Sequence, residues 1–390
     1  MAAHAVLSAS AAYRWLACPP SAQLEQQFPN ETSSYAEEGT FAHALAELKL
    51  SRAMNFIKPS TFKKRLAQAK KSPLFSNGLE EYIDQYVAQV GERFMESKKT
   101  CKDTLVLLEQ KLDFSGWVPD GYGTGDVVII GDDVIEVIDL KYGKGVPVSA
   151  EGNPQTRLYG LGAIASFEML YGFSRVKMTI IQPRLDSIST EEMTVKDLLT
   201  WADEYLVPRA ELATAGEGEH TPGDHCRFCR AKAVCRARAE ENLKLAQYDF
   251  KKPALLDDGE ITDILAKVEE LQKWAEDVQN YAFDQALNHG KKWPGWKLVE
   301  GRSNRKYSDE EAVAEVLKQA GYSDEDIYKP KELLGITAME KVTGKDIFNQ
   351  LLSKFIIKPA GKPTLVPESD KRPEINTAAS AAEDFSDMLD

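Results

Sequence analysis

Residues 123–145 read GTGDVVIIGDDVIEVIDLKYGKG. Two short runs rich in Val and Ile are separated by a Gly-Asp-Asp turn, which predicts two neighbouring strands joined by a hairpin. Asp126 lies in the first run, and Asp139 and Lys141 lie at the end of the second. Because strand side chains alternate between the two faces of a sheet, Asp139 and Lys141 should share a face. Glu136 lies three residues before Asp139 and should point the other way, so we leave it out of the candidate site.

The segments around this hairpin predict a sheet flanked by helices. Residues 103–114 and 175–184 are rich in Val, Ile and Leu and read as further strands. Elsewhere apolar residues recur at helical spacing. The helices expected from this spacing cover residues 41–53, 79–96, 155–169 and about 191–213. We therefore predict an α/β fold with a mixed central sheet flanked by helices.

The character of the sequence changes along the chain and predicts three parts. The sheet and its helices fall in residues 1–245. Residues 246–359 read as a mainly helical region, with the strongest helical spacing in 261–287. Residues 360–390 are rich in Pro, Ser, Ala and acidic residues and lack periodicity, which is typical of a disordered tail.

The composition is that of a globular protein with room for a sizeable core, with 390 residues of which 43% are hydrophobic and 28% charged. No apolar run is long enough to span a membrane, and the first residues lack the pattern of a signal peptide. We therefore expect a cytoplasmic protein without a membrane partner. The net charge of -13 argues against a protein that coats nucleic acid through bulk electrostatics. It is compatible with an enzyme whose cleft holds divalent cations.

Asp126, Asp139 and Lys141 have the chemistry that phosphodiester cleavage needs. Carboxylates can hold one or two divalent cations that activate water, and a lysine can stabilise the charge that develops on the phosphate. The alternative is a charged, solvated strand end, because Asp-x-Lys is a common tripeptide. Glu109, in the strand before, is either a supporting acid or an outward-facing polar residue.

Three cysteines follow the sheet region with the spacing C-x2-C-x5-C, at Cys226, Cys229 and Cys235. A cytoplasmic chain is a poor setting for disulfides, so this clustering predicts a metal site. Such a site needs a fourth ligand. From the residues alone it is Cys18, Cys101 or His225.

Four motifs in this order resemble those of RecB-like nucleases in the PD-(D/E)XK superfamily. GTGDVVII and EVIDLKYGKG match the G-x-x-D and D-x-K motifs, GTFAHALAE matches the helix with a metal-binding histidine at His43, and PQTRLYGLGA matches Q-x-x-x-Y. The resemblance implies a restriction-endonuclease-like core in residues 1–245. It further implies Mg2+ or Mn2+ held by His43, Asp126 and Asp139, with Asp126, Asp139 and Lys141 as catalytic residues. The Q-x-x-x-Y pair, Gln155 and Tyr159, would contact substrate.

The cysteines resemble those of AddB-type helicase-nucleases and CRISPR-associated RecB-like exonucleases, which carry one cysteine before the nuclease core and three after it. This resemblance implies that Cys18 joins Cys226, Cys229 and Cys235 as ligands of a structural 4Fe-4S cluster. Zn2+ in the same four thiolates is the alternative. Cys101 is then a free, buried thiol.

The resemblance implies a divalent-metal-dependent DNA exonuclease that acts on DNA with a free end. The chain also looks like a phage and prophage family of RecB-like proteins, so we expect a role in phage DNA replication or recombination, with proteins of those processes as partners. One alternative is a module on a nuclease fold that binds DNA or protein without cutting. Another is a zinc scaffold with an incidental D-x-K.

Overall fold

The computed structural model describes residues 6–29, 34–245 and 256–298, together with positions 318, 319, 344 and 350. By its contacts the chain divides into two units, Met1–His289 and Gly290–Asp390. The first unit carries all the helices and strands discussed below. Much of the expected helical region 246–359, and all of the expected tail 360–390, lie outside the described residues.

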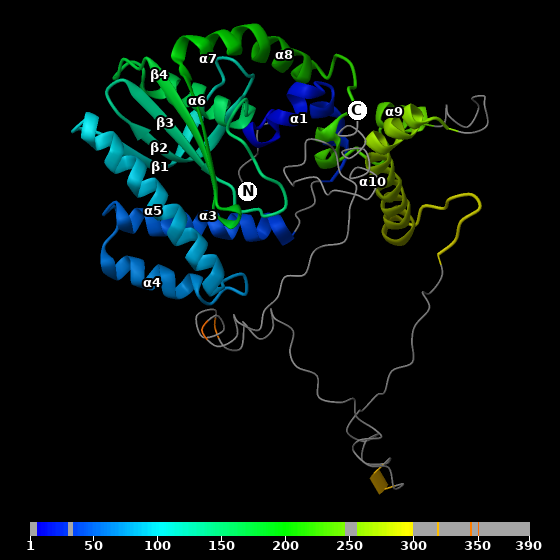
Figure 1. Ribbon diagram of the computed structural model, residues 1–390, viewed down its shortest axis with the longest axis horizontal. Coiled ribbons are helices and arrows are strands. Elements are labelled where there is room, and N and C mark those ends of the chain that lie inside the picture. The colour runs from blue at the N-terminus through cyan, green and yellow to red at the C-terminus, as the bar shows by residue number, and fades with distance from the viewer. Residues whose placement is uncertain are drawn as a thin grey trace, which may run out of the picture. The chain divides into compact units, whose positions relative to one another are not determined.

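A five-stranded mixed sheet forms the centre of the first unit (Figure 1). Its strands follow the order β1-β2-β3-β4-β5, and every neighbouring pair is antiparallel except β3 and β4, which are parallel. A parallel pair needs a long crossover connection, and α6 supplies it between β3 and β4. The strands are β1 (Leu105–Asp113), β2 (Tyr122–Ile130), β3 (Val134–Leu140), β4 (Arg175–Gln182) and β5 (Ser187–Thr194). The predicted α/β fold with a mixed, helix-flanked sheet is confirmed.

Helices cover both faces of the sheet (Figure 1). Each face buries its own cluster of apolar side chains, which is the arrangement expected when a sheet is apolar on both sides. One face is covered by η1 (Ala9–Ala11), α1 (Ala12–Ala17), α6 (Pro154–Phe167), α7 (Val195–Trp201), the π-helical η4 (Ala202–Leu206) and α8 (Val207–Ala215). The other face is covered by α3 (Ser34–Ala53), α4 (Pro59–Ala69) and α5 (Asn77–Thr100).

The prediction of a helix from about residue 191 was wrong at its start. Residues 187–194 form β5, an edge strand that pairs with β4, and the helix begins at Val195. The strand has the sequence SISTEEMT and none of its residues is buried, so it lacks the apolar run by which strands were recognised. The Thr194 hydroxyl accepts a hydrogen bond from the Asp197 amide at 3.0 Å and caps the helix instead.

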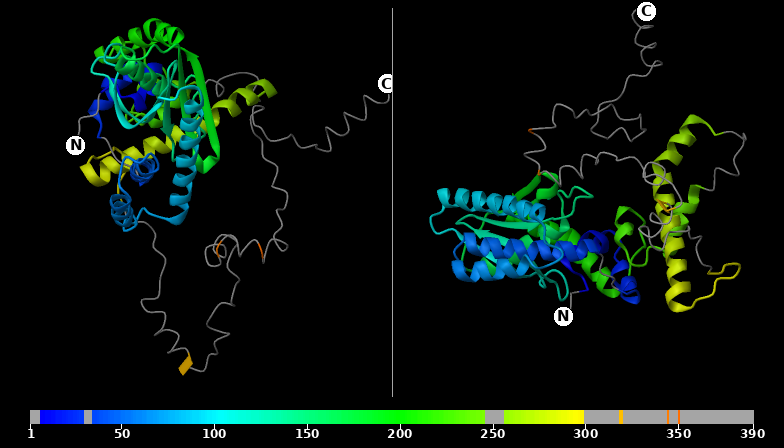
Figure 2. Two further views of the ribbon diagram at one scale, coloured as in Figure 1. Left: turned by 90° about the vertical axis from the view of Figure 1, so that its left-hand side faces the viewer. Right: turned by 90° about the horizontal axis from the view of Figure 1, so that it is seen from below.

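The remaining helices lie outside the layers that cover the two faces of the sheet. They are α2 (Ser21–Leu24), η2 (Glu25–Gln27), η3 (Pro183–Leu185), η5 (Asp224–Phe228), α9 (Arg236–Leu243) and α10 (Asp258–His289). Helix α10 packs beside α9 (Figure 2), and the buried Arg238 of α9 bonds Glu270 and Asp277 of α10 at 2.6 and 2.7 Å. The charged side of α10 is therefore tied to the segment that carries the cysteines.

Candidate active site

Asp126 joins two elements at the centre of the candidate site. Its Oδ1 lies 2.9 Å from His43 Nδ1, on α3, and its Oδ2 accepts a hydrogen bond from the Leu140 amide of β3 at 2.7 Å. Burial alone would lower the pKa of His43, but the Asp126 carboxylate more than offsets this and holds that pKa above its usual value. The predicted metal ligands His43 and Asp126 therefore lie in direct contact.

Asp139 and Lys141 share one face, as the alternation predicted, and meet Gln155 there. Lys141 Nζ lies 2.9 Å from Asp139 Oδ2 and donates to Gln155 Oε1 at 2.7 Å. The Gln155 amide donates in turn to Asp139 Oδ1 at 3.1 Å and to Tyr159 Oη at 3.2 Å. Asn153 caps α6 and accepts from the Gln155 backbone amide, so the start of the helix fixes the position of this side chain. Asp139, Lys141, Gln155 and Tyr159 thus form one connected network.

The first glycine of the G-x-x-D motif has a steric reason in this network. A Cβ at Gly123 would lie 2.6 Å from Cε1 of Tyr159, a distance that no real Cβ contact shows. Only glycine lets the Tyr159 ring rest on β2 at this point. Burial, reinforced by the Asp139 charge, raises the pKa of the Tyr159 hydroxyl, so it acts as a neutral hydrogen-bonding group.

Asp139 is the most deeply buried carboxylate of the network, with 4% of its surface exposed. Burial raises its pKa and the Lys141 ammonium lowers it, and the balance stays above the usual value. Its Oδ2 is paired with Lys141 by charge and accepts no directed hydrogen bond. A buried carboxylate oxygen without a hydrogen-bond donor suits a site that also takes a cation.

Glu136 lies on the opposite face, as expected, where it accepts hydrogen bonds from Arg93 and Thr179. Glu109, by contrast, lies close to the candidate site. It lines a recess with His43, Asp126 and two residues that sequence reasoning missed, Glu47 and Tyr86. The position of Glu47, one helical turn after His43, was a signal that could have found it. Tyr86 comes from α5 and only the tertiary fold brings it here.

Glu109 has an unusual backbone conformation and an unusual pKa for a strand residue. Its φ is +48°, a left-handed conformation that is uncommon outside glycine. Its side chain reaches solvent at the mouth of the recess, but partial burial and the nearby Asp126 and Glu47 carboxylates raise its pKa to about 7. Negative charge is therefore crowded around Glu109.

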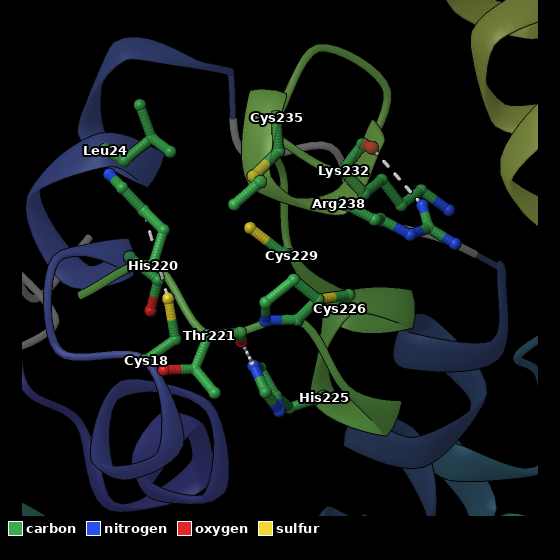
Figure 3. Close-up of a pocket in the computed structure, with 13 residues that line it drawn as sticks. Cys18, Leu24, His220, Thr221, His225, Cys226, Cys229, Lys232, Cys235 and Arg238 are labelled. Carbon is green, nitrogen blue, oxygen red and sulfur yellow. Dashed lines mark hydrogen bonds between the residues drawn. The ribbon is translucent and has the colours of Figure 1, made fainter. Parts of the chain in front are cut away.

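The cysteines form a second centre, at the junction of the first and last segments of the sheet domain (Figure 3). Cys18 follows α1, Cys226 and Cys229 lie in and just after η5, and Cys235 caps α9. All four line one recess, whereas Cys101 lies apart, at the end of α5. The structure therefore brings together the four cysteines that the resemblance implied.

Two histidines lie in the same recess. His225 Nε2 lies 2.9 Å from the Thr221 carbonyl, so this ring nitrogen already has a partner, and His220 Nδ1 lies 4.0 Å from Cys18 Sγ (Figure 3). Burial raises the thiol pKa of Cys18 and Cys226 and brings that of Cys229 to about 12. Thiols held protonated by burial bind a metal as thiolates, so binding releases their protons to solvent. The side chains of Lys232 and Arg238 line the recess and would offset the negative charge of such a centre.

Neither centre has its side chains already arranged in metal-binding geometry. Within residues 6–29, 34–245 and 256–298, no three His, Cys, Asp or Glu side chains are already grouped so that they could hold an ion. In the first centre the carboxylates are instead paired with His43, Lys141, Gln155 and the Leu140 amide. The donor types fit their expected groups, oxygen and imidazole for Mg2+ or Mn2+ and thiolate for iron-sulfur or zinc.

Comparison with known proteins places the chain in a family. The family model described as "Protein of unknown function (DUF2800)" matches residues 4–373. The chain belongs to the DUF2800 family. Among solved structures, the one titled "Crystal structure of SSO0001" is 18% identical over 50% of this chain and 85% of that chain, with a TM-score of 0.22. That similarity is too low for a comparison of sites.

A groove of about 1070 Å3 in the DUF2800 chain links the two centres. Lys141 and Gln155 line it together with Arg227 and Phe228, the two residues between Cys226 and Cys229. Phe228 and Tyr13 stay largely exposed there, at 59% and 54%. The Arg227 guanidinium lies over the Phe228 ring, 4.7 Å from its centroid. Helix α10 contributes Glu270, Lys273, Glu276 and Asp277 to the lining, so the charge of the groove is mixed.

Among the described helices of the DUF2800 chain, none has the length and apolar character to cross a membrane.

Proposed function

We propose that this DUF2800 protein is a divalent-metal-dependent DNA exonuclease with a RecB-like PD-(D/E)XK core. The observation that carries the proposal is the direct contact of Asp139 with both Lys141 and Gln155, beside the His43–Asp126 pair. These residues come from four elements and meet at one place. A charged, solvated strand end would not bury Asp139 to 4% exposure or link it to α6 through Gln155.

His43, Asp126 and Asp139 are the residues that would hold Mg2+ or Mn2+. A bound divalent cation would polarise the phosphate of the substrate. It would also lower the pKa of a bound water, so that hydroxide forms more readily and can attack the phosphate. His43 and the Leu140 amide each contact one oxygen of the Asp126 carboxylate, so the orientation of this carboxylate is fixed before an ion binds. Such support limits how far the ligand moves on binding, which favours an ordered site.

Lys141 is the residue that would act on the phosphate. Its ammonium stands between Asp139 and Gln155, both within 2.9 Å, and can donate to a phosphate oxygen as negative charge builds up on it. Gln155 holds the ammonium in place with its carbonyl and Asp139 with its amide. Tyr159 accepts from the same amide and limits the rotation of Gln155. Gln155 and Tyr159 thus serve as positioning residues that also border the substrate.

The groove between the two centres is the path that we assign to a DNA strand with a free end. Exposed aromatic rings such as Tyr13 and Phe228 give bases a stacking surface, and Arg227 and Lys141 give phosphates a partner. Degradation from an end suits a role in phage DNA replication or recombination, the role that the motif resemblance implies.

We assign a 4Fe-4S cluster to Cys18, Cys226, Cys229 and Cys235, with zinc as the alternative. The cluster would be structural, because it would link the segment before the sheet to the segment after it. Four thiols, three of them buried, with two cationic side chains beside them favour a centre of net negative charge. Metal analysis of anaerobically purified protein, with its absorption spectrum, distinguishes a brown iron-sulfur protein from a colourless zinc protein.

The test of the proposed function compares wild type with Asp139→Asn on labelled DNA in Mn2+. We expect cleavage to fall by about 10²-fold or more, because the substitution removes a charge that holds the cation. Asp132→Asn, in the exposed turn of the same hairpin, is the matched control and should cleave like wild type. Equal cleavage by Asp139→Asn would contradict the proposal. Binding without cleavage by wild type would favour the non-cleaving module.

A further inference from the structure

A second groove, of about 1320 Å3, lies beside the groove that links the two centres. Residues of α1, of η2 and of the segment after η2 line one part of it, and residues of α10 line another. The two grooves share six lining residues around the cysteine segment, which are Ser10, Arg14, Arg227, Phe228, Lys232 and Asp277. The grooves therefore meet at this segment, and an extended ligand in one of them can continue into the other.

Arg227 and Phe228 form a flat surface where the two grooves meet. The Cys229 amide donates to the Cys226 carbonyl at 3.0 Å, and this tight turn buries both cysteines and leaves the two residues between them exposed. The Phe228 ring is 59% exposed, with the Arg227 guanidinium 4.7 Å from its centroid. An aromatic ring with a cation beside it can stack on an unpaired base of any identity. The surface therefore suits a single strand.

The second groove also offers phosphates two cations that no carboxylate neutralises. Three carboxylates line it, and each lies close to a basic side chain. The pairs are Glu25–Arg14, Asp277–Lys232 and Asp284–His289, at 2.9, 2.7 and 3.7 Å. Arg227 and Arg230 line the groove as well, and within the part of the chain that the structure describes their guanidinium groups form no ion pair. On a chain with a net charge of -13, two such cations in one groove favour an anionic ligand.

We infer that the second groove is a binding site for the part of a single DNA strand that lies beyond the bond to be cleaved. The inference rests on the proposed function, which places that bond beside Lys141 in the first groove. Phe228 stacks on one base where the strand passes from the first groove to the second, and Arg230 contacts a phosphate beyond it. The strand then has two regions of contact, so its affinity depends on its length.

The first experiment measures the Kd of single strands of increasing length. Fluorescence anisotropy of labelled oligothymidylates of about 4 to 16 nucleotides is recorded on full-length protein without Mg2+ or Mn2+, so that no strand is cleaved. The affinity should rise once a strand is long enough to pass Phe228. Arg230→Gln should weaken the longest strands by about fivefold and leave the shortest unchanged, because these occupy the first groove alone. Arg65→Gln, an exposed arginine on α4, is the matched control and should bind every length like wild type.

The second experiment locates the base that stacks on Phe228. A single abasic site is moved along the longest strand, and the Kd is measured for each position. At one position it should weaken binding to wild type by about tenfold, which is typical of one stacked base. Phe228→Ala should weaken the intact strand by about the same factor and lose its response to that position, whereas Phe228→Trp should keep both. Phe56→Ala removes a ring of similar exposure, 54%, between α3 and α4 and should behave like wild type.

The outcomes separate this inference from the proposed function. Equal weakening of short and long strands by Arg230→Gln would overturn the second groove as a strand site. No position-specific effect in wild type, or an effect that persists in Phe228→Ala, would overturn the base contact, and both results leave the nuclease proposal in place. No binding of any DNA by folded wild type would contradict both proposals. Thermal unfolding and metal content show whether each variant keeps its fold and its cysteine centre, and Phe228→Leu replaces Phe228→Ala if the alanine variant does not.

Discussion

At the residue scale, Lys141 connects the buried Asp139 carboxylate to Gln155 and so stabilises the arrangement of the site. Its ammonium offsets the buried Asp139 charge and is itself held by Gln155. A lysine so placed has two roles, one in the resting site and one on the phosphate, and a substitution should separate them.

Lys141→Met is the substitution that separates these roles. It should lower cleavage by about 10²- to 10³-fold, as expected for the loss of one donor to the transition state. Mn2+ affinity should stay the same or rise, because Asp139 loses a competing cation. Cleavage rates and Mn2+ titration on the same preparation check both halves. Unchanged cleavage would show that Lys141 is only a partner of Asp139.

The same residues show how far single-sequence reasoning reached. Asp139 and Lys141 were predictable as a pair because the strand period is two. Gln155 and Tyr159 came from the resemblance to the Q-x-x-x-Y motif, because periodicity alone makes them only one face of a helix. Glu109 stayed ambiguous, because its place opposite Asp126 depends on the β1–β2 register. Tyr86 carries no local signal, since it reads as an ordinary core residue of an amphipathic helix.

At the element scale, α6 is held in place by the edge strand β5. The Glu191 carboxylate of β5 accepts from Arg157 Nε of α6 at 2.9 Å and from the Gly152 amide at 3.1 Å. Because α6 carries Gln155 and Tyr159, this bond sets where the helix starts relative to the sheet. This strand was not predicted from the sequence, since its apolar positions are few and partly exposed.

The Glu191 contact should give a pH-dependent part of the stability. Burial alone would raise the pKa of Glu191, but Arg157 and the Gly152 amide hold it below the usual 4.5. A lowered pKa means that the stabilisation is present above 4.5 and is lost as the pH falls through the folded value. Glu191→Gln should therefore lower the free energy of unfolding by about 1 kcal/mol at neutral pH. The gap in Tm between the two proteins should close in acid, and a gap independent of pH would contradict this reading.

At the scale of the whole molecule, the cysteine recess joins segments that are far apart in the sequence. Cys18 comes before the sheet, and the other three cysteines come after its last strand. The spacing of the later three cysteines indicated a metal site, but the choice of Cys18 over Cys101 and His225 needed the resemblance. In the fold, Cys18 and His225 line the recess and Cys101 does not.

Cys18→Ser should remove the metal-mediated link between the segment before the sheet and the segment after it. The protein should lose its bound metal and, with it, its colour if the centre is iron-sulfur. Its Tm should fall, because the metal no longer constrains a loop of about 200 residues. Iron and zinc content, thermal unfolding and limited proteolysis check these points. Cys101→Ser is the control, and an equal loss of metal from it would contradict the assignment of ligands.

The central claim concerns what the DUF2800 chain does to DNA, and a time course on end-labelled linear DNA tests it most directly. The protein is purified anaerobically and compared in Mn2+ and in EDTA, with a closed circle of the same sequence beside it. The account predicts progressive shortening of the linear DNA in Mn2+ only, with the circle left intact. No shortening by folded protein that carries its cysteine-bound metal, or equal shortening in EDTA, would contradict it.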